Sequence, residues 1–340
     1  MIKTGVNKKE INIGLQLLKI YLSYNVVNSH SLIISNVSKH LRFFLINSLH
    51  VPTFFIMSFY FFHKTLISRD LNKLVQRFYR LLIPYLIWPF IFLIINIIIS
   101  FISNIEFPHS FINLRNQLLT GCSYIPSLWF QWDLIFETFL FIIIELLFHK
   151  HIIFILVNIG LISYFFQYSN YNYNYFKNFI YEKKYIFGRL CETIPFSVSG
   201  FIIGYYEIIK NLKKYRKKTI YLVFIIFYLV YKYNIFSIPS GFYYQSLKLQ
   251  VLSLCLFIFF SFISDNYLPK YLIILIKQMS KFSAGIYYIH FPLIQYFKHC
   301  FLPVKVGTIY GGLFIYIISY LICLIGNMIF FKTKLKNLFQ

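Results

Sequence analysis

Long apolar runs separated by short polar segments make up most of the chain. A helix needs about 20 predominantly apolar residues to span a bilayer. By this criterion the predicted spans are 11–34, 44–62, 81–103, 127–148, 152–168, 190–209, 219–235, 248–264, 282–300 and 307–331. The fifth and seventh runs are short, and Pro292 interrupts the ninth. The pattern predicts an all-α, polytopic integral membrane bundle of about ten transmembrane helices, in one domain over residues 1–340.

The first run resembles a signal peptide only in the basic residues that precede it. It is too long for one, and no small-residue cleavage site follows it. It also contains polar side chains, namely Lys19, Asn25, Asn28 and His30. We therefore expect a span that is retained in the membrane.

Composition supports the membrane assignment and excludes other classes of protein. The chain is 59% hydrophobic, 22% aromatic and 13% charged, whereas soluble domains are about 45–50% apolar and about 25% charged. The mean hydropathy of +0.65 agrees. Disordered and fibrous chains are excluded because Phe and Tyr are abundant while Gly and Pro are scarce.

The net charge of +23 would suggest nucleic acid in a soluble protein. Here most Lys and Arg lie between apolar runs, and they favour one side of the predicted bundle by roughly two to one. This bias predicts a multi-pass protein of the cell membrane with both termini in the cytoplasm, the lipid bilayer as partner and no nucleic acid. The five cysteines have no CxxC spacing, so neither a disulfide framework nor a metal site is expected.

Two ionisable residues in the first span are functional candidates, because burying such groups in a membrane is costly. Lys19 and His30 are eleven residues apart, which at 100° each is roughly 1,100°, so both lie on one helix face about 16 Å apart. His30 is a candidate general base, because its pKa lets it take a proton from a hydroxyl near neutral pH. Alternatively, a neighbouring helix satisfies His30 and Lys19 snorkels to the inner interface.

The segment 63–80 carries Arg69, Lys73, Arg77 and Arg80 at spacings that form one stripe if the segment is helical. Such a helix can lie on the inner membrane surface, attracted to anionic lipid headgroups. Alternatively the stripe clamps phosphates, for which Arg is well suited. For Arg77 and Arg80, which abut the apolar run LLIPYLIW, we favour phosphate binding.

The fourth span carries two carboxylates, Asp133 and Glu137, one helical turn apart. They can orient an imidazole, accept a proton or pair with a basic residue of another helix. A purely structural ion pair is equally compatible with the sequence. Trp129 lies where an interfacial aromatic belt is common. His290, just before Pro292, is a further candidate, although a lone buried histidine is more often structural.

Five motifs in order resemble the membrane-bound acyltransferase-3 family, which includes O-acetylases of surface polysaccharides. The first is Lys19-x10-His30, with Lys19 where the family more often has Arg and without the acidic residue that usually precedes it. The second, HVPTFFIMSFYFF, is similar to a P-x-F-F-x-x-S-G helix, with Phe59 in place of the glycine. The others are RFYRLLIPYLIW, SLWFQWDL and FSAGIYYIHFPLI.

The resemblance covers residues from about 11 to 330 and implies an O-acyltransferase. Such an enzyme moves an acyl group, usually acetyl, from acyl-coenzyme A to a hydroxyl of an envelope polysaccharide or glycolipid, without a metal. In this scheme His30 is the general base or a transient acyl carrier, and Asp133 or Glu137 orients it. The donor phosphates are held by Arg77 and Arg80, with Lys19. Two alternatives lack this chemistry: a transporter or flippase for a glycan or lipid intermediate, and a purely structural membrane subunit.

Overall fold

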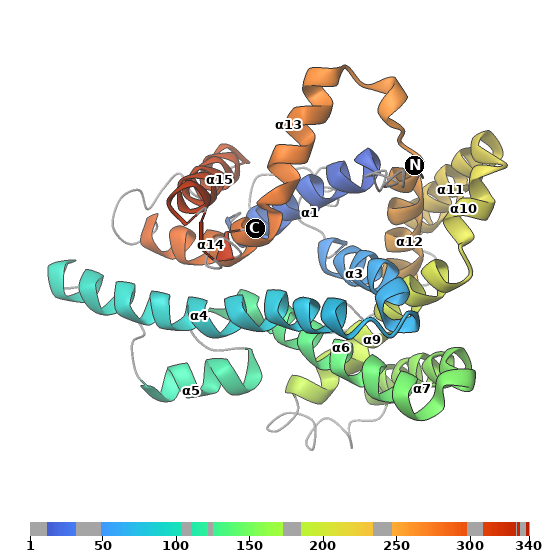
Figure 1. Ribbon diagram of the computed structural model, residues 1–340, viewed down its shortest axis with the longest axis horizontal. Helices are drawn as coiled ribbons and strands as arrows, with labels where there is room; N and C mark the ends of the chain where they lie inside the picture. The colour runs from blue at the N-terminus through green and yellow to red at the C-terminus, as the bar shows by residue number, and fades with distance from the viewer. Residues whose placement is uncertain are drawn as a thin grey trace, which may run out of the picture.

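The computed structural model describes residues 12–31, 49–103, 111–121, 125–172, 185–233, 247–297, 309–330, 332–333 and 338–339. Within these ranges the chain is helical with short connections and contains no strand. In Figure 1 the long helix α4 runs along the molecule with α5 on one side of it. Helices α1, α13, α14 and α15 lie on the other side of α4. The predicted all-α class is confirmed.

Every predicted span overlaps a helix of the structure. The helices are α1 (Ile13–Ser31), α3 (His50–Ile67), α4 (Leu71–Ser103), α5 (Phe111–Thr120), α6 (Trp129–Phe148), α7 (Ile152–Asn172), α9 (Tyr185–Tyr205), α10 (Ile208–Lys213), α11 (Arg216–Lys232), α12 (Leu247–Ser261), α13 (Lys270–Lys281), α14 (Ser283–Tyr296) and α15 (Ile309–Ile329). Short 3₁₀ turns η1 (Pro126–Leu128), η2 (His149–His151) and η3 (Asp265–Tyr267) join some of them.

Three helical stretches of the described chain are long and apolar enough to cross a membrane, namely Leu71–Phe101, Trp129–Phe166 and Gly311–Ile329. Large apolar side chains on these stretches are exposed, for example Phe101 at 87% and Phe154 at 70%. Such a surface belongs against lipid rather than water. The count of ten spans and the sidedness of the termini stay predictions, and residues 1–11 of the N-terminal tail lie outside the described residues.

Helix α4 begins ten residues earlier than the predicted third span. The Asp70 carboxylate caps its first turn by accepting a bond from the Lys73 backbone N–H at 3.1 Å. The hydrogen bond from the Lys73 side chain holds the pKa of Asp70 below its usual value. Arg69 precedes the helix at φ +50°, so the predicted stripe is broken there. Residues 71–80 continue directly into the apolar part of α4, so they belong to the same helix as the predicted third span.

Two further boundaries differ from the sequence interpretation. Helix α14 continues through Pro292 instead of being interrupted there. Proline is tolerated in membrane helices, where neighbouring helices and local adjustments satisfy the freed backbone groups. Helix α9 begins at Tyr185, so Arg189 lies inside a helix and not in the loop that the sequence suggested.

The core is an aromatic cluster where α3, α6 and α9 meet. Phe59 packs on Phe141 with ring centroids 4.5 Å apart, and Phe141 packs on Phe201 at 5.5 Å. All three rings are fully buried. Gly200 permits this close packing, because a Cβ there would lie 2.1 Å from the Ile56 carbonyl oxygen. Helix α3 is thereby fixed against α9, and its other faces contact α1, α4 and α12.

Candidate functional site

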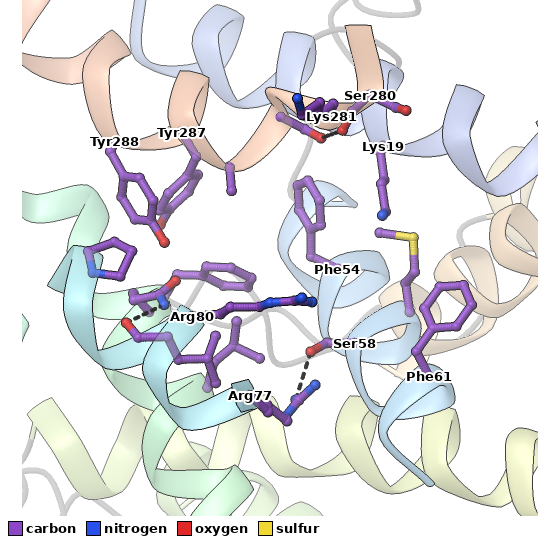
Figure 2. A pocket seen from close by; sticks show the side chains of 18 of the residues that line it. Lys19, Phe54, Ser58, Phe61, Arg77, Arg80, Ser280, Lys281, Tyr287 and Tyr288 are labelled. Carbon is purple, nitrogen blue, oxygen red and sulfur yellow. Dashed lines mark hydrogen bonds between the residues drawn. The ribbon is translucent and has the colours of Figure 1, made fainter. Parts of the chain in front are cut away.

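A cavity of about 630 Å³ lies among α1, α3, α4, α6, α13 and α14. Figure 2 shows its labelled side chains: Lys19 enters from α1 and Arg80 extends across from α4, with Arg77 beside Ser58. The lining residues are Gln16, Lys19, Phe54, Met57, Ser58, Phe61, Arg77, Arg80, Leu81, Pro84, Phe130, Gln131, Leu134, Lys277, Ser280, Lys281, Ser283, Ala284, Tyr287 and Tyr288. The structure thus brings together the three predicted donor-binding residues.

The charged lining of this cavity is entirely basic in the described part of the chain. The cations are Lys19, Arg77, Arg80, Lys277 and Lys281. None of them forms an ion pair with a described carboxylate, whereas cations elsewhere do: Arg69 with Glu145, Lys73 with Asp70, Arg189 with Asp133 and Lys210 with Glu207. A cleft lined by one sign of charge concentrates counter-ions of the other sign. The cavity therefore favours an anion.

Arg77 is held in place by neutral groups. Its Nε donates to Thr138 Oγ1 at 3.2 Å, and its Nη2 donates to Ser58 Oγ at 3.0 Å. The guanidinium lies 4.2 Å from the Phe62 ring centroid and 5.5 Å from that of Phe59. Phe59 and Phe62 thus supply two aromatic faces for this guanidinium. The side chain is fixed in position and its charge is not neutralised by a described carboxylate.

The opposite wall of the cavity belongs to α1 and α13. Ser280 Oγ donates to Gln16 Oε1 at 2.6 Å and so ties α13 to α1 beside Lys19. Lys277 and Lys281, four residues apart on α13, both face the cavity. From the sequence, the basic residues of this segment are expected only to orient the protein in the membrane. The signal for a site was their spacing within the stretch KYLIILIKQMSK.

His30 does not line the cavity; it lies about 16 Å further along α1 than Lys19. Its ring centroid is 5.2 Å from that of His290 on α14, and 5.5 Å from the Phe291 ring, which it meets edge-on. The two histidines that the sequence analysis considered separately therefore lie together. Among the described residues, no group of three or more His, Cys, Asp or Glu side chains is arranged to hold a metal ion.

The carboxylates of α6 bond to α9. Asp133 Oδ1 accepts from Arg189 Nη2 at 2.8 Å, and Arg189 Nη1 donates to the Thr120 carbonyl, also at 2.8 Å. The same guanidinium lies 5.6 Å from the ring centroids of Trp129 and Trp132. Trp129 therefore contacts a buried cation in addition to any interfacial role. Arg189 is not among the residues predicted from the sequence, although a carboxylate in an apolar helix signals a basic partner.

Glu137, one turn further along α6, is bonded to two hydroxyls of α9. Thr193 Oγ1 donates to Glu137 Oε1 at 2.5 Å, and Ser197 Oγ donates to Oε2. Neither Glu137 nor Asp133 has a described hydrogen bond to His30. In this geometry the two carboxylates join α6 to α9.

The acyltransferase-3 family model, described as an acyltransferase domain, matches residues 12–330. The chain belongs to this family. No curated protein and no solved structure matches it. The family match covers nearly the whole chain and confirms the resemblance carried by the five motifs. The protein is a membrane acyltransferase.

In this acyltransferase the candidate groups occupy two levels of α1. The basic cavity, with Lys19, lies toward the beginning of the helix, and His30 lies one residue before its end. The cavity can hold an anionic part of a substrate, whereas an uncharged imidazole can take or carry a group at the other level. The candidate binding residues and the candidate base thus lie apart along α1.

Proposed function

We propose that this acyltransferase transfers an acyl group, acetyl in the simplest case, from acyl-coenzyme A to a hydroxyl of an envelope polysaccharide or glycolipid. The observation that carries the proposal is the basic cavity, in which five cations face one space without a described carboxylate partner. The phosphates of a coenzyme A donor supply the missing negative charge. Arg77, with its fixed planar guanidinium, is the central phosphate contact.

The distance along α1 supports a donor with a long arm. Lys19 and His30 are about 16 Å apart along the helix axis. A donor that is anchored by its phosphates at the cavity reaches His30 only if a long uncharged segment separates the phosphates from the acyl group. The pantetheine arm of acyl-coenzyme A is such a segment, whereas an acyl phosphate has none.

We place the chemistry at His30. In the proposed step, one nitrogen of the imidazole takes the proton of the acceptor hydroxyl while the oxygen attacks the thioester carbonyl. A C–O ester bond forms, the C–S bond breaks, and the thiolate leaves with the proton that His30 has taken. A site within the membrane shields the thioester from water. The acceptor approaches from the outer side if the predicted sidedness holds, because His30 lies at the end of α1 away from the N-terminus.

Asp133 and Glu137, predicted to orient His30, bond instead to α9. We therefore propose that they act at a distance, by fixing α9 against α6. Trp129 joins the same network through Arg189.

The test uses purified protein in nanodiscs and acetyl-coenzyme A labelled in the acetyl group. We expect the wild-type protein to bind the donor and to pass label to an envelope glycan fraction, and His30→Ala to bind the donor without passing label. The matched control is His63→Ala, which removes a buried histidine of α3 that does not line the cavity. Absence of donor binding by the wild-type protein would contradict the proposal.

A further inference from the structure

We propose that His290 is a positioning residue for His30, with its Nε2 accepting a hydrogen bond from a ring N–H of His30. This inference rests on the proposed role of His30 as the base. It assigns a task to a buried histidine on α14, far from His30 in sequence. Helix α1 packs against α14 and α15, and Figure 1 shows the three helices grouped together.

The tautomer of His290 follows from its contact with its own helix. His290 Nδ1 lies 3.2 Å from the Ile286 carbonyl oxygen. A carbonyl oxygen only accepts hydrogen bonds, so Nδ1 carries the proton. In the neutral ring the lone pair is then on Nε2. His290 therefore presents an acceptor to its surroundings.

This acceptor is buried and has no partner within the described structure. The His290 side chain is fully buried, and Nε2 makes no hydrogen bond there. Leaving a buried polar atom unpaired is costly, so such an atom in a native protein requires an explanation. A partner that donates during the reaction is one explanation.

His30 is placed to be that partner. The ring centroids are 5.2 Å apart and the ring planes are inclined by 40°. From this arrangement a turn about χ2, which is a broad torsion in histidine, brings a His30 N–H toward Nε2. Phe291 meets His30 edge-on at 5.5 Å and limits its other positions. Near His30, helix α1 packs closely against α15. Gly312 of α15 permits this packing, because a Cβ at that position would lie 2.0 Å from Asn28 Oδ1 of α1.

The consequence for catalysis is a defined orientation of the base. If one nitrogen of His30 donates to His290, the other holds the lone pair that takes the hydroxyl proton. The imidazolium that forms keeps its bond to His290 until the proton leaves with the thiolate. His290 thus acts through His30, as a buried carboxylate acts through histidine in a Ser-His-Asp triad.

Two substitutions separate this role from a structural one. His290→Asn keeps an N–H near the position of Nδ1, which can still donate to Ile286, but has nothing at Nε2. His290→Gln places an amide oxygen near Nε2 but loses the bond to Ile286. If His290 positions His30, the His290→Asn variant has a kcat lower by on the order of 10–100-fold, and its Kd for the donor is unchanged. The His290→Gln variant then retains more activity than the His290→Asn variant. If His290 is only structural, the order reverses, because Asn preserves the structural bond.

A matched control and a second readout complete the experiment. His63 on α3 is also buried and has Nδ1 on a backbone carbonyl of its own helix, that of Tyr60. The same two substitutions at His63 are expected to leave kcat unchanged. Nitrogen-15 NMR of histidine-labelled protein gives the protonation of each His290 nitrogen and any coupling to His30 across the hydrogen bond, without need of turnover.

The outcomes are distinct. Higher activity of Gln than Asn, with His290 Nε2 unprotonated and coupled to His30, supports the positioning role. The positioning role is overturned if the His290→Asn variant is at least as active as the His290→Gln variant, or if His290 Nε2 is protonated. If the wild-type protein binds no acyl-coenzyme A, the proposed function fails, and the NMR measurement still decides whether the His30–His290 bond exists.

Discussion

Removing the Arg77 guanidinium is the sharpest test of the basic cavity. The side chain is held by Ser58 and Thr138 and lies against the Phe62 ring, so it loses little conformational freedom when it binds an anion. A hydrogen bond to a charged group contributes about 1.5–3 kcal/mol. Arg77→Ala is therefore expected to weaken coenzyme A binding by about 10- to 150-fold. A bidentate contact with phosphate places the loss toward the upper end of this range.

Arg77→Lys separates charge from geometry. An ammonium group keeps the charge but lacks the planar fork that bonds to Ser58 and Thr138 while facing the cavity. We therefore expect Lys to recover only part of the affinity lost in the alanine variant. The matched control is Lys73→Ala, which removes one exposed positive charge a turn earlier on α4 from a residue that does not line the cavity. The Lys73–Asp70 pair is exposed, so its loss affects stability little.

The assay is titration of each variant with coenzyme A by calorimetry in nanodiscs, after a thermal unfolding measurement has shown that the variant is folded. Unchanged affinity in Arg77→Ala would refute the assignment of Arg77 to the donor. Equal losses in Arg77→Ala and Lys73→Ala would also refute it, since only the general positive field would then matter.

Three other predictions concern the rest of the site. His30→Ala should lose on the order of 10²–10⁴-fold in transfer rate with donor affinity nearly intact, and wild-type transfer would contradict the mechanism. Replacing both Lys277 and Lys281 by Ala should weaken coenzyme A binding at low salt and much less at high salt, because both side chains are exposed and salt screens their charges. A loss of affinity that does not depend on salt would contradict this prediction. Asp133→Asn should destabilise the protein by about 3–5 kcal/mol, because it breaks the buried ion pair between Asp133 and Arg189. The double variant Asp133→Leu, Arg189→Met should regain stability and retain acyl transfer. Stability is measured by denaturation in micelles, and transfer by the label assay. A folded double variant without transfer would show that the pair is needed for the chemistry.

The helices could be predicted from the sequence wherever length and apolarity decide the structure. Each apolar run overlaps a helix, because in a membrane the backbone must satisfy its hydrogen bonds within the segment. The start of α4 at Leu71 was missed, because its first turns carry charged side chains that interrupt the hydrophobic signal. The inclusion of Arg189 in α9 was missed for the same reason.

The lining of the basic cavity could be predicted in part. Arg77 and Arg80 were found from their spacing and position, and Lys19 from its place within an apolar run. Lys277 and Lys281 were not found, because basic residues between membrane spans are expected for orientation alone. The pairing of His30 with His290 depends on how α1 and α14 pack, and no local pattern of one sequence records that contact.

The basic cavity and the histidine pair are built from neighbouring parts of the chain. The cavity is lined by cations of α1, α4 and α13, so an anion bound there would lie against all three helices. Helix α1 also carries His30, and α13 leads directly into α14, which carries His290. Helix α1 therefore contributes to both the cavity and the histidine pair. Helix α13 lines the cavity, and the next helix, α14, carries the second histidine. Under the proposed mechanism, the residues that bind the donor and the two histidines are therefore carried by the same two stretches of chain, α1 and α13–α14.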